Sequence, residues 1–309
     1  SSDLYADVDY IGIAGLWWVE LATGRGGGRE VIVPLARGLT LPDVPGTAPL
    51  RYESRAITLN LLTTGDGTTT IDARWTERDG AAAEFSAVIA QPSGHESLNV
   101  VIPWSERRFQ FTSKQNTRPA TGAVRVGAHS WCVDATHDAW GVQDLGRGIW
   151  PYSNRWNWAS ASGRGVDASG AERLVGLQFG GKWTVGTSAT ENALCVAGRL
   201  SKIGDELEWT YDWDDPMAPW RVRTTTSEQV DVTLHPTFDR YDDTNLRLLR
   251  MQVHQCFGTW TGSRAGWEGG TSMHCAACNH SAQIGDLEVV CKWGVCGVQA
   301  RYIWGASGV

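Results

Sequence analysis

Alternating hydrophobic and polar positions run through most of the chain and predict β-strands. Residues 57–61 and 71–75 show this two-residue period, and each is followed by a turn segment that contains Asp-Gly. Asp-Gly favours a hairpin because its turn needs positive φ. No long segment has the 3.6-residue period of a capped helix. The pattern predicts an all-β fold with few short helices, either one large antiparallel barrel or two β-barrel halves packed together.

The length of 309 residues suits one large β domain or two smaller ones. The polar, glycine-rich segment 162–170 lies near the middle and either joins two halves or forms a hairpin tip. We expect an N-terminal half over 1–160 and a C-terminal half over 171–309. The composition shifts abruptly to Cys, His and Gly at about residue 263, so the tail of the second half is atypical.

Composition and charge narrow the function classes. The net charge of -7 argues against a nucleic-acid partner, which would need a basic patch. The sequence contains no run of about 18 apolar residues and therefore no predicted membrane helix. No signal peptide is visible, so the cytoplasm is the expected location. There is no dinucleotide fingerprint either, and we expect no cofactor.

The densest chemical motif lies between Trp140 and Trp158. It combines the carboxylate of Asp144 and the guanidinium of Arg147 with four of the chain's 17 tryptophans. Aromatic walls around a few polar groups are typical of a small-molecule pocket. Its candidate ligand-binding residues are Trp150, Tyr152, Trp156, Asn157 and Trp158. The alternative interpretation is a tryptophan-rich core in which Asp144 and Arg147 form a structural ion pair.

Asp144 and Arg147 are the first catalytic candidates, Asp144 as an acid/base group or ligand anchor and Arg147 as its partner or an anion clamp. A dry aromatic site would raise the pKa of the Asp144 carboxyl and make it a proton donor, whereas Arg147 at close range would keep it ionised. Glu191 is a second carboxylate that could flank the same substrate. Further candidates for binding are Lys114, Asn116, Lys182, Trp183 and Asn192.

His95 and Glu96 stand at the start of a predicted strand, after a Pro-Ser-Gly turn. Successive residues of a strand point to opposite faces, so only one of them is expected to face a pocket. Histidine is a suitable general base near neutral pH, and both residues are candidate catalytic groups. The alternative is a solvated strand end.

These motifs carry a family resemblance. The chain resembles the bacterial domain-of-unknown-function family 2804 from about Leu16 to about Gly262, and more distantly it is similar to lipocalin-like enzymes. The matching segments are 94–104, 108–116, 144–163, 180–184, 190–194, 217–220 and 254–258. The distant resemblance is to carotenoid hydratases, kievitone hydratase and cyclases that guide Diels–Alder reactions. It implies two lipocalin-like halves and acid/base chemistry on a hydrophobic molecule.

The tail departs from the family past Gly262. Five of the seven cysteines lie between Cys256 and Cys296. Cys275, Cys278, Cys291 and Cys296 have a spacing that could hold structural zinc, although disulfides or a changed reading frame would also explain it. We predict no metal.

The leading hypothesis is a cofactor-independent hydratase, isomerase or cyclase that acts on a hydrophobic small molecule in a tryptophan-lined cavity. Indole faces can stabilise a cation that forms when an alkene is protonated. One alternative is a calycin-like protein that binds or carries a small molecule. Another is a protein that binds or cleaves carbohydrate, since indole faces also stack on sugars.

Overall fold

The protein is built from β-strands joined by turns. The computed structural model describes residues 11–20, 23–40, 49–134, 139–149, 151, 154–226, 230–245, 250–264, 273–282, 288–292 and 295–300. From residue 273 onward these ranges are described by their backbone alone. Within them every regular element is a strand and none is an α-helix, so the all-β prediction is confirmed. None of the described elements is a helix long and apolar enough to span a membrane.

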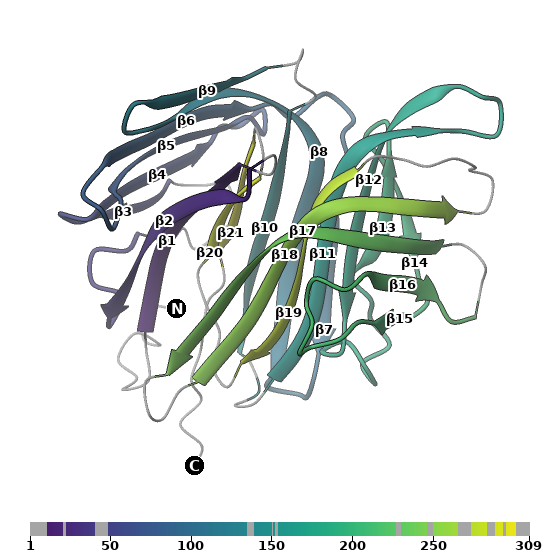
Figure 1. The fold of residues 1–309 in the computed structure, drawn as a ribbon. Helices are drawn as coiled ribbons and strands as arrows, with labels where there is room; N and C mark the ends of the chain where they lie inside the picture. Colours follow the sequence, from purple (N-terminus) through teal and green to yellow (C-terminus); the bar gives the residue numbers. More distant parts are fainter. Residues whose placement is uncertain are drawn as a thin grey trace.

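A sheet of ten strands forms one part of the molecule (Figure 1). Its strands are β3 (Leu50–Glu53), β4 (Ile57–Thr63), β5 (Thr69–Thr76), β6 (Ala82–Ile89), β7 (Leu98–Pro103), β8 (Phe109–Val126), β9 (His129–Val133), β10 (Trp140–Ile149), β20 (Glu288–Lys292) and β21 (Val295–Ala300). They are ordered β20-β21-β10-β8-β6-β5-β4-β3, and β7 and β9 also pair with β8. The described pairings are antiparallel, apart from the parallel pairing of β10 with β21.

A second sheet of nine strands forms the other part, ordered from the β14 edge to the β15 edge. Its strands are β11 (Asn154–Val166), β12 (Glu172–Gly181), β13 (Asn192–Val196), β14 (Arg199–Ile203), β15 (Leu207–Thr210), β16 (Trp220–Thr224), β17 (Val230–Asn245), β18 (Arg250–Arg264) and β19 (Met273–Ala282). The order is β14-β13-β12-β11-β19-β18-β17-β16-β15, and all of these pairings are antiparallel.

A separate two-stranded ribbon completes the fold. It consists of β1 (Ile11–Glu20) and β2 (Arg25–Pro34), paired along their whole length. In Figure 1 the ribbon lies between the strands β3–β6 and the long strands β17 and β18. Because it faces both sheets, the ribbon brings residues from the start of the chain beside residues near its end.

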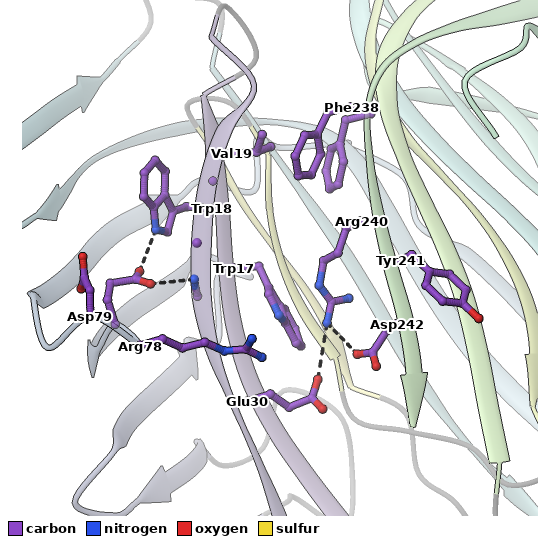
Figure 2. Close-up of a pocket in the computed structure, with 15 residues that line it drawn as sticks. Trp17, Trp18, Val19, Glu30, Arg78, Asp79, Phe238, Arg240, Tyr241 and Asp242 are labelled. Atoms are coloured by element: carbon purple, nitrogen blue, oxygen red, sulfur yellow. Dashed lines mark hydrogen bonds and ion pairs between the residues drawn. The ribbon is translucent and has the colours of Figure 1, made fainter. Parts of the chain in front are cut away.

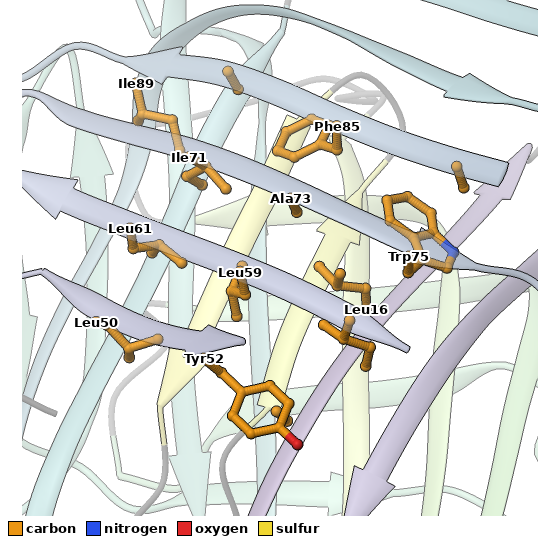
Figure 3. Close-up of a cluster of buried hydrophobic side chains, with 14 of the residues drawn as sticks. Leu16, Leu50, Tyr52, Leu59, Leu61, Ile71, Ala73, Trp75, Phe85 and Ile89 are labelled. Atoms are coloured by element: carbon orange, nitrogen blue, oxygen red, sulfur yellow. The ribbon is translucent and has the colours of Figure 1, made fainter. Parts of the chain in front are cut away.

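The predicted alternation is borne out in the core of the ten-stranded sheet. The odd-numbered residues of 57–61 and 71–75 are buried, whereas their neighbours are more exposed. Leu16 of the ribbon is fully buried among them, and Figure 3 shows it beside Leu59 and Trp75. A second apolar cluster, which includes Leu177, Phe179 and Trp260, fills the concave side of the nine-stranded sheet. Each sheet therefore has its own core.

The predicted turns have the backbone conformation that Asp-Gly favours. Gly67 joins β4 to β5 with φ 83°, and Gly80 joins β5 to β6 with φ 91°. The glycine-rich segment 162–170 contains the end of β11 and the turn to β12, so it is a hairpin tip inside the second sheet. The chain changes from the first sheet to the second between β10 and β11. The division into halves at 1–160 and 171–309 stays a prediction.

Arg118 of β8 is buried without a carboxylate partner in the described part of the chain, and only 1% of it is exposed. Its guanidinium donates to the carbonyls of Ile89 (3.1 Å) and Ala90 (3.0 Å) and to the side-chain oxygen of Gln143 (3.2 Å). Burial lowers its pKa to about 10. These bonds join β6, β8 and β10 near Pro119 and Ala120. There β8 stops pairing with β10 and begins to pair with β6.

Replacing Arg118 with Lys should therefore destabilise the fold. An ammonium cannot reproduce the planar fork, so several buried carbonyl oxygens would lose their donor. We expect Arg118→Lys to lower the free energy of unfolding by about 3 kcal/mol, measured by urea denaturation. Arg125→Lys is the control, since Arg125 lies on the same strand but its pair with Glu84 is exposed. Similar losses in both variants would contradict a special role for Arg118.

Candidate functional site

Three of the predicted residues meet at the junction of the two sheets. Lys114 of β8 binds Asp144 of β10 through its ammonium group, and its Nζ lies 3.4 Å from Oε2 of Glu191, just before β13. Thr112 donates to the second oxygen of Asp144 at 2.9 Å. The two candidate carboxylates therefore share one lysine, which links the ten-stranded sheet to the nine-stranded sheet.

The local sequence explains this arrangement. Asp144 lies directly opposite Lys114 in the β8–β10 ladder, and directly opposed residues of an antiparallel pair share a face. Gly180 of β12 has no side chain where Glu191 lies: a Cβ there would come within 2.8 Å of the Glu191 carboxylate. Glycine at this position is what lets Glu191 reach Lys114.

The three ionic groups are almost completely buried. The exposed fractions of the Lys114, Asp144 and Glu191 side chains are 1%, 10% and 0%. Charges at such depth are stable only when they are paired and hydrogen-bonded. The buried Lys114 group therefore suits a structural link between the two sheets. It could transfer protons only to a substrate that penetrates to this depth.

Lys202 of β14 lies near the same junction. Its ammonium donates to the carbonyl and hydroxyl oxygens of Thr190, next to Glu191. Burial lowers the pKa of Lys202 to about 8, and the negative charges of Glu191 and Glu206 oppose that shift.

The predicted aromatic residues that the structure describes, Trp156, Trp158 and Trp183, are core residues. Trp156 stacks on Trp183 with ring centroids 5.8 Å apart, and Trp104 donates its indole N–H to the carbonyl of Trp183 at 2.7 Å. Trp158 is 4% exposed and belongs to the same apolar cluster. We call this the junction cluster; its buried members are Val19, Ile102, Val142, Trp156, Trp158, Trp183 and Phe257.

Asn157 and Lys182 lie elsewhere, at the side of the nine-stranded sheet that holds its core. The Tyr211 hydroxyl donates to Oδ1 of Asn157 at 3.4 Å, and the Lys182 ammonium bonds to the same hydroxyl. Asn157 is adjacent to Trp156 and Trp158 in β11, so its side chain points to the opposite face. The structure thus divides the predicted binding residues between two faces of one sheet.

His95 and Glu96 fasten the start of β7 to neighbouring segments. The His95 ring bonds to the carbonyl of Asn116 at 2.9 Å, and Glu96 accepts from the Leu200 amide at 2.6 Å and pairs with Arg199 at 2.8 Å. Neither contacts the Lys114 group in the described interactions. Their catalytic role stays a prediction.

Asn116 and Asn192 are buried and bond to backbone groups. Asn116 donates to the Leu177 carbonyl at 2.9 Å, and Asn192 accepts from the Gly180 amide at 2.9 Å. Both therefore support the β12 region rather than an open surface.

Several predicted residues lie outside the described part. Arg147 is described only by its backbone position in β10, opposite Phe111, while Trp150 and Tyr152 lie outside the described residues altogether. The side chains of Cys275, Cys278, Cys291 and Cys296 also lie outside them. Among the described residues, no group of three or more His, Cys, Asp or Glu side chains is placed to hold a metal. The zinc question stays open.

A pocket of about 600 Å³ lies between the ribbon and β17–β18 (Figure 2). We call it the ribbon pocket. Its lining residues are Trp17, Trp18, Val19, Gly26, Gly27, Gly28, Glu30, Glu77, Arg78, Asp79, Phe238, Arg240, Tyr241, Asp242 and Phe257. None of the residues predicted from the sequence is among them.

Arg240 is the central polar group of the ribbon pocket. Its guanidinium carbon lies 3.9 Å from the ring centre of Trp17, which is a cation–π contact. It also pairs with Asp242 at 3.0 Å and with Glu30 at 3.5 Å, as Figure 2 shows. This network connects the ribbon to β17 and neutralises the arginine.

Glu77 fixes the opposite wall. Its Oε1 accepts from the indole N–H groups of Trp18 (2.7 Å) and Trp75 (2.8 Å), and its Oε2 accepts from the Gly28 amide at 2.9 Å. At Gly27 a Cβ would come within 2.7 Å of this carboxylate, so glycine is required for the close approach. The sequence did not predict this pocket. The feature that could have indicated it is the run of glycines at 26–28, which pairs with Trp17 and Trp18 across the ribbon.

The comparisons with known proteins define the class to which this chain belongs. The model of a family described as a domain of unknown function, DUF2804, matches residues 4–274. The chain therefore belongs to the DUF2804 family, and the predicted membership is confirmed. No curated protein matches the chain.

Solved structures share the fold. The chain is similar to a provisionally assigned AttH (NE1406) from Nitrosomonas europaea, with 12% identity and a TM-score of 0.50 over 88% of this chain and 81% of that one. At this identity the likeness concerns the fold alone. CghA is 11% identical over 88% of both chains, and its TM-score of 0.40 carries no argument about this protein.

The buried Lys114 group should be essential for stability. We expect Asp144→Asn to lower the free energy of unfolding by about 3 kcal/mol, because it removes one charge from a buried ionic group. Chemical denaturation measures this. Asp231→Asn is the matched control, since its pair with Arg221 is exposed and should contribute less than about 1 kcal/mol. Equal effects would show that Asp144 does not stabilise the junction and would favour its catalytic role.

Lys202 gives a pH dependence with a defined sign. Its pKa of about 8 lies below its ordinary value of 10.5, so the unfolded chain binds more protons between these pH values. Stability linked to Lys202 therefore rises with pH in this window. Between about pH 7 and about pH 9.5, wild type should gain stability relative to Lys202→Met in urea unfolding. A constant difference would contradict the lowered pKa.

Proposed function

We propose that this protein binds a mainly hydrophobic small molecule in the ribbon pocket. The observation that supports this is the pocket itself, about 600 Å³ in volume, with Trp17, Trp18, Phe238 and Phe257 beside a few charged groups. Small-molecule sites usually enclose about 300–1,000 Å³ and combine apolar walls with a few polar groups. The N-terminal ribbon and β17 each supply one wall.

The charges of the pocket favour a neutral or cationic ligand. Its carboxylates are Glu30, Glu77, Asp79 and Asp242, and they outnumber its cations, Arg78 and Arg240. Arg240 is also neutralised by two of these carboxylates. An anion would therefore meet net repulsion from the walls.

A cofactor-independent acid/base enzyme is the second candidate. It is favoured by the position of Glu30 and Asp242 on either side of Arg240, next to the indole face of Trp17. A carboxylate held ionised by Arg240 could remove a proton from a bound substrate, and an indole face could stabilise positive charge that develops on that substrate. The resemblance to lipocalin-like hydratases and cyclases supports this chemistry. A calycin-like carrier would use the same walls without proton transfer.

The cytoplasm stays our expectation for the location, and fractionation of the native cells would test it.

Ligand binding can be tested with the neutral fluorescent probe N-phenyl-1-naphthylamine. We expect its fluorescence to rise in the presence of the wild type. Trp17→Ala should weaken binding by about tenfold or more, because it removes a pocket wall and exposes Arg240. Trp213→Ala is the control. Trp213 packs against His254, and the side chain of His254 points to the face of β18 opposite to that of its neighbour Gln255 and of the pocket residue Phe257.

Absence of probe binding by the wild type, or the same affinity in Trp17→Ala as in Trp213→Ala, would refute the pocket assignment. If the probe binds, release of a proton-transfer product from terpenoid alkenes distinguishes enzyme from carrier. In that assay Asp242→Asn should lose turnover and retain the probe.

A further inference from the structure

Three polar side chains on the nine-stranded sheet are buried without a hydrogen-bond partner for at least one atom. Gln178 of β12, Gln255 of β18 and Trp158 of β11 are 2%, 1% and 4% exposed. The atoms are both amide atoms of Gln178, Nε2 of Gln255 and the indole nitrogen of Trp158. Buried polar groups in folded proteins almost always have a partner, so each of these groups requires an explanation.

The strand register places all three on one face of the sheet. Trp158 of β11 and Gln255 of β18 are both opposite Cys278 of β19, the strand between them. Gln178 is opposite Ser160, two residues along β11 from Trp158. Directly opposed residues, and residues two apart in a strand, point to the same side. The three groups therefore form one patch, which we call the polar patch.

The polar patch faces the first sheet. Ser162, which shares the face of Ser160, accepts from the Thr117 amide of β8 at 3.1 Å. On the same face Gly180, opposite Trp158, lies against Glu191. The patch is therefore enclosed by the junction, beside the Lys114 group, and is shielded from bulk water.

The patch also adjoins the ribbon pocket through shared side-chain contacts. Gln255 accepts from the pocket residue Arg240 at 3.4 Å through its Oε1. Trp158 belongs to the junction cluster together with Val19 and Phe257, which line the pocket. Phe257 of β18 is aligned with Gln178 of β12 through the directly opposed residues of β19 and β11 between them. Three strand spacings separate the two residues, which is roughly 14 Å. A molecule of ten to fifteen carbons spans about that length.

We propose that the polar patch is the inner end of the ligand site and binds an uncharged oxygen function, a hydroxyl or carbonyl, of the molecule whose apolar body occupies the ribbon pocket. The inference rests on the proposed function and names its ligand class. The indole N–H of Trp158 and the amides of Gln178 and Gln255 donate to such an oxygen, and Gln178 Oε1 accepts a hydroxyl proton. A carboxylate is disfavoured because the ribbon pocket, which the ligand also occupies, has more carboxylates than cations.

Two probes of equal carbon number test this: geraniol, a terpenoid alcohol, and β-myrcene, a hydrocarbon. Affinities are measured for wild type, Gln178→Met and Gln255→Met by tryptophan fluorescence and calorimetry. Methionine nearly matches glutamine in shape and has no amide. Trp213→Ala is again the control, and urea unfolding shows that each variant is folded.

The wild type should bind geraniol about tenfold more tightly than β-myrcene, because the site's polar groups stay unpaired with the hydrocarbon. Each Gln→Met variant should reduce that preference severalfold and leave β-myrcene affinity unchanged. Gln178→Met should be at least as stable as wild type, since both atoms of the buried amide that it removes are unpaired, whereas Gln255→Met also removes the bond from Arg240 and serves only as the second affinity variant.

Other outcomes overturn the inference in distinguishable ways. Equal affinity for the two probes, unaffected by either variant, means that the patch binds only water and leaves the proposed function intact. Binding of neither probe to the wild type removes both the proposed function and the inference. If Gln178→Met loses stability instead, its amide is structural and the inference fails.

Discussion

The buried bond between Lys114 and Asp144 is the interaction on which the arrangement of this molecule depends. A lysine with 1% of its side chain exposed is stable only if carboxylates surround it, and Asp144 and Glu191 come from different sheets. The bond therefore holds β8 and β10 against β12 and β13. The junction cluster also joins the two sheets, and the ionic group adds a fixed pairing that defines how one sheet faces the other.

That relative placement creates the candidate site. The ribbon β1–β2 packs on the first sheet through Leu16, while its other side faces β17 and β18 of the second sheet. Arg240 and Glu30 join across this gap, and Glu77 fixes Trp18 and the glycines. The pocket is thus an interface between parts of the chain more than 200 residues apart.

The Lys114 group and the ribbon pocket have different properties and fit different roles. The first is buried and charge-paired, as a structural link would be. The second has space, aromatic walls and several carboxylates. The polar patch lies between them, and a ligand that reaches it from the pocket would approach the carboxylates of the junction. The acid/base hypothesis, which was based on Asp144 and Glu191, is therefore compatible with a ligand that enters through the ribbon pocket.

The sequence by itself determined the all-β class, the alternating core positions, the Asp-Gly hairpins and the family. These depend on neighbours within a few residues or on matched motifs, so short-range patterns suffice. It also singled out Lys114 as a binding candidate and Asp144 and Glu191 as catalytic candidates, without showing that they meet. Only the tertiary structure decided that Trp156 and Trp158 are core residues and that Trp17 and Arg240 line the pocket. Such contacts depend on how two sheets and a ribbon pack, and alternation within a strand is the same whether its inner face meets a core or a cavity.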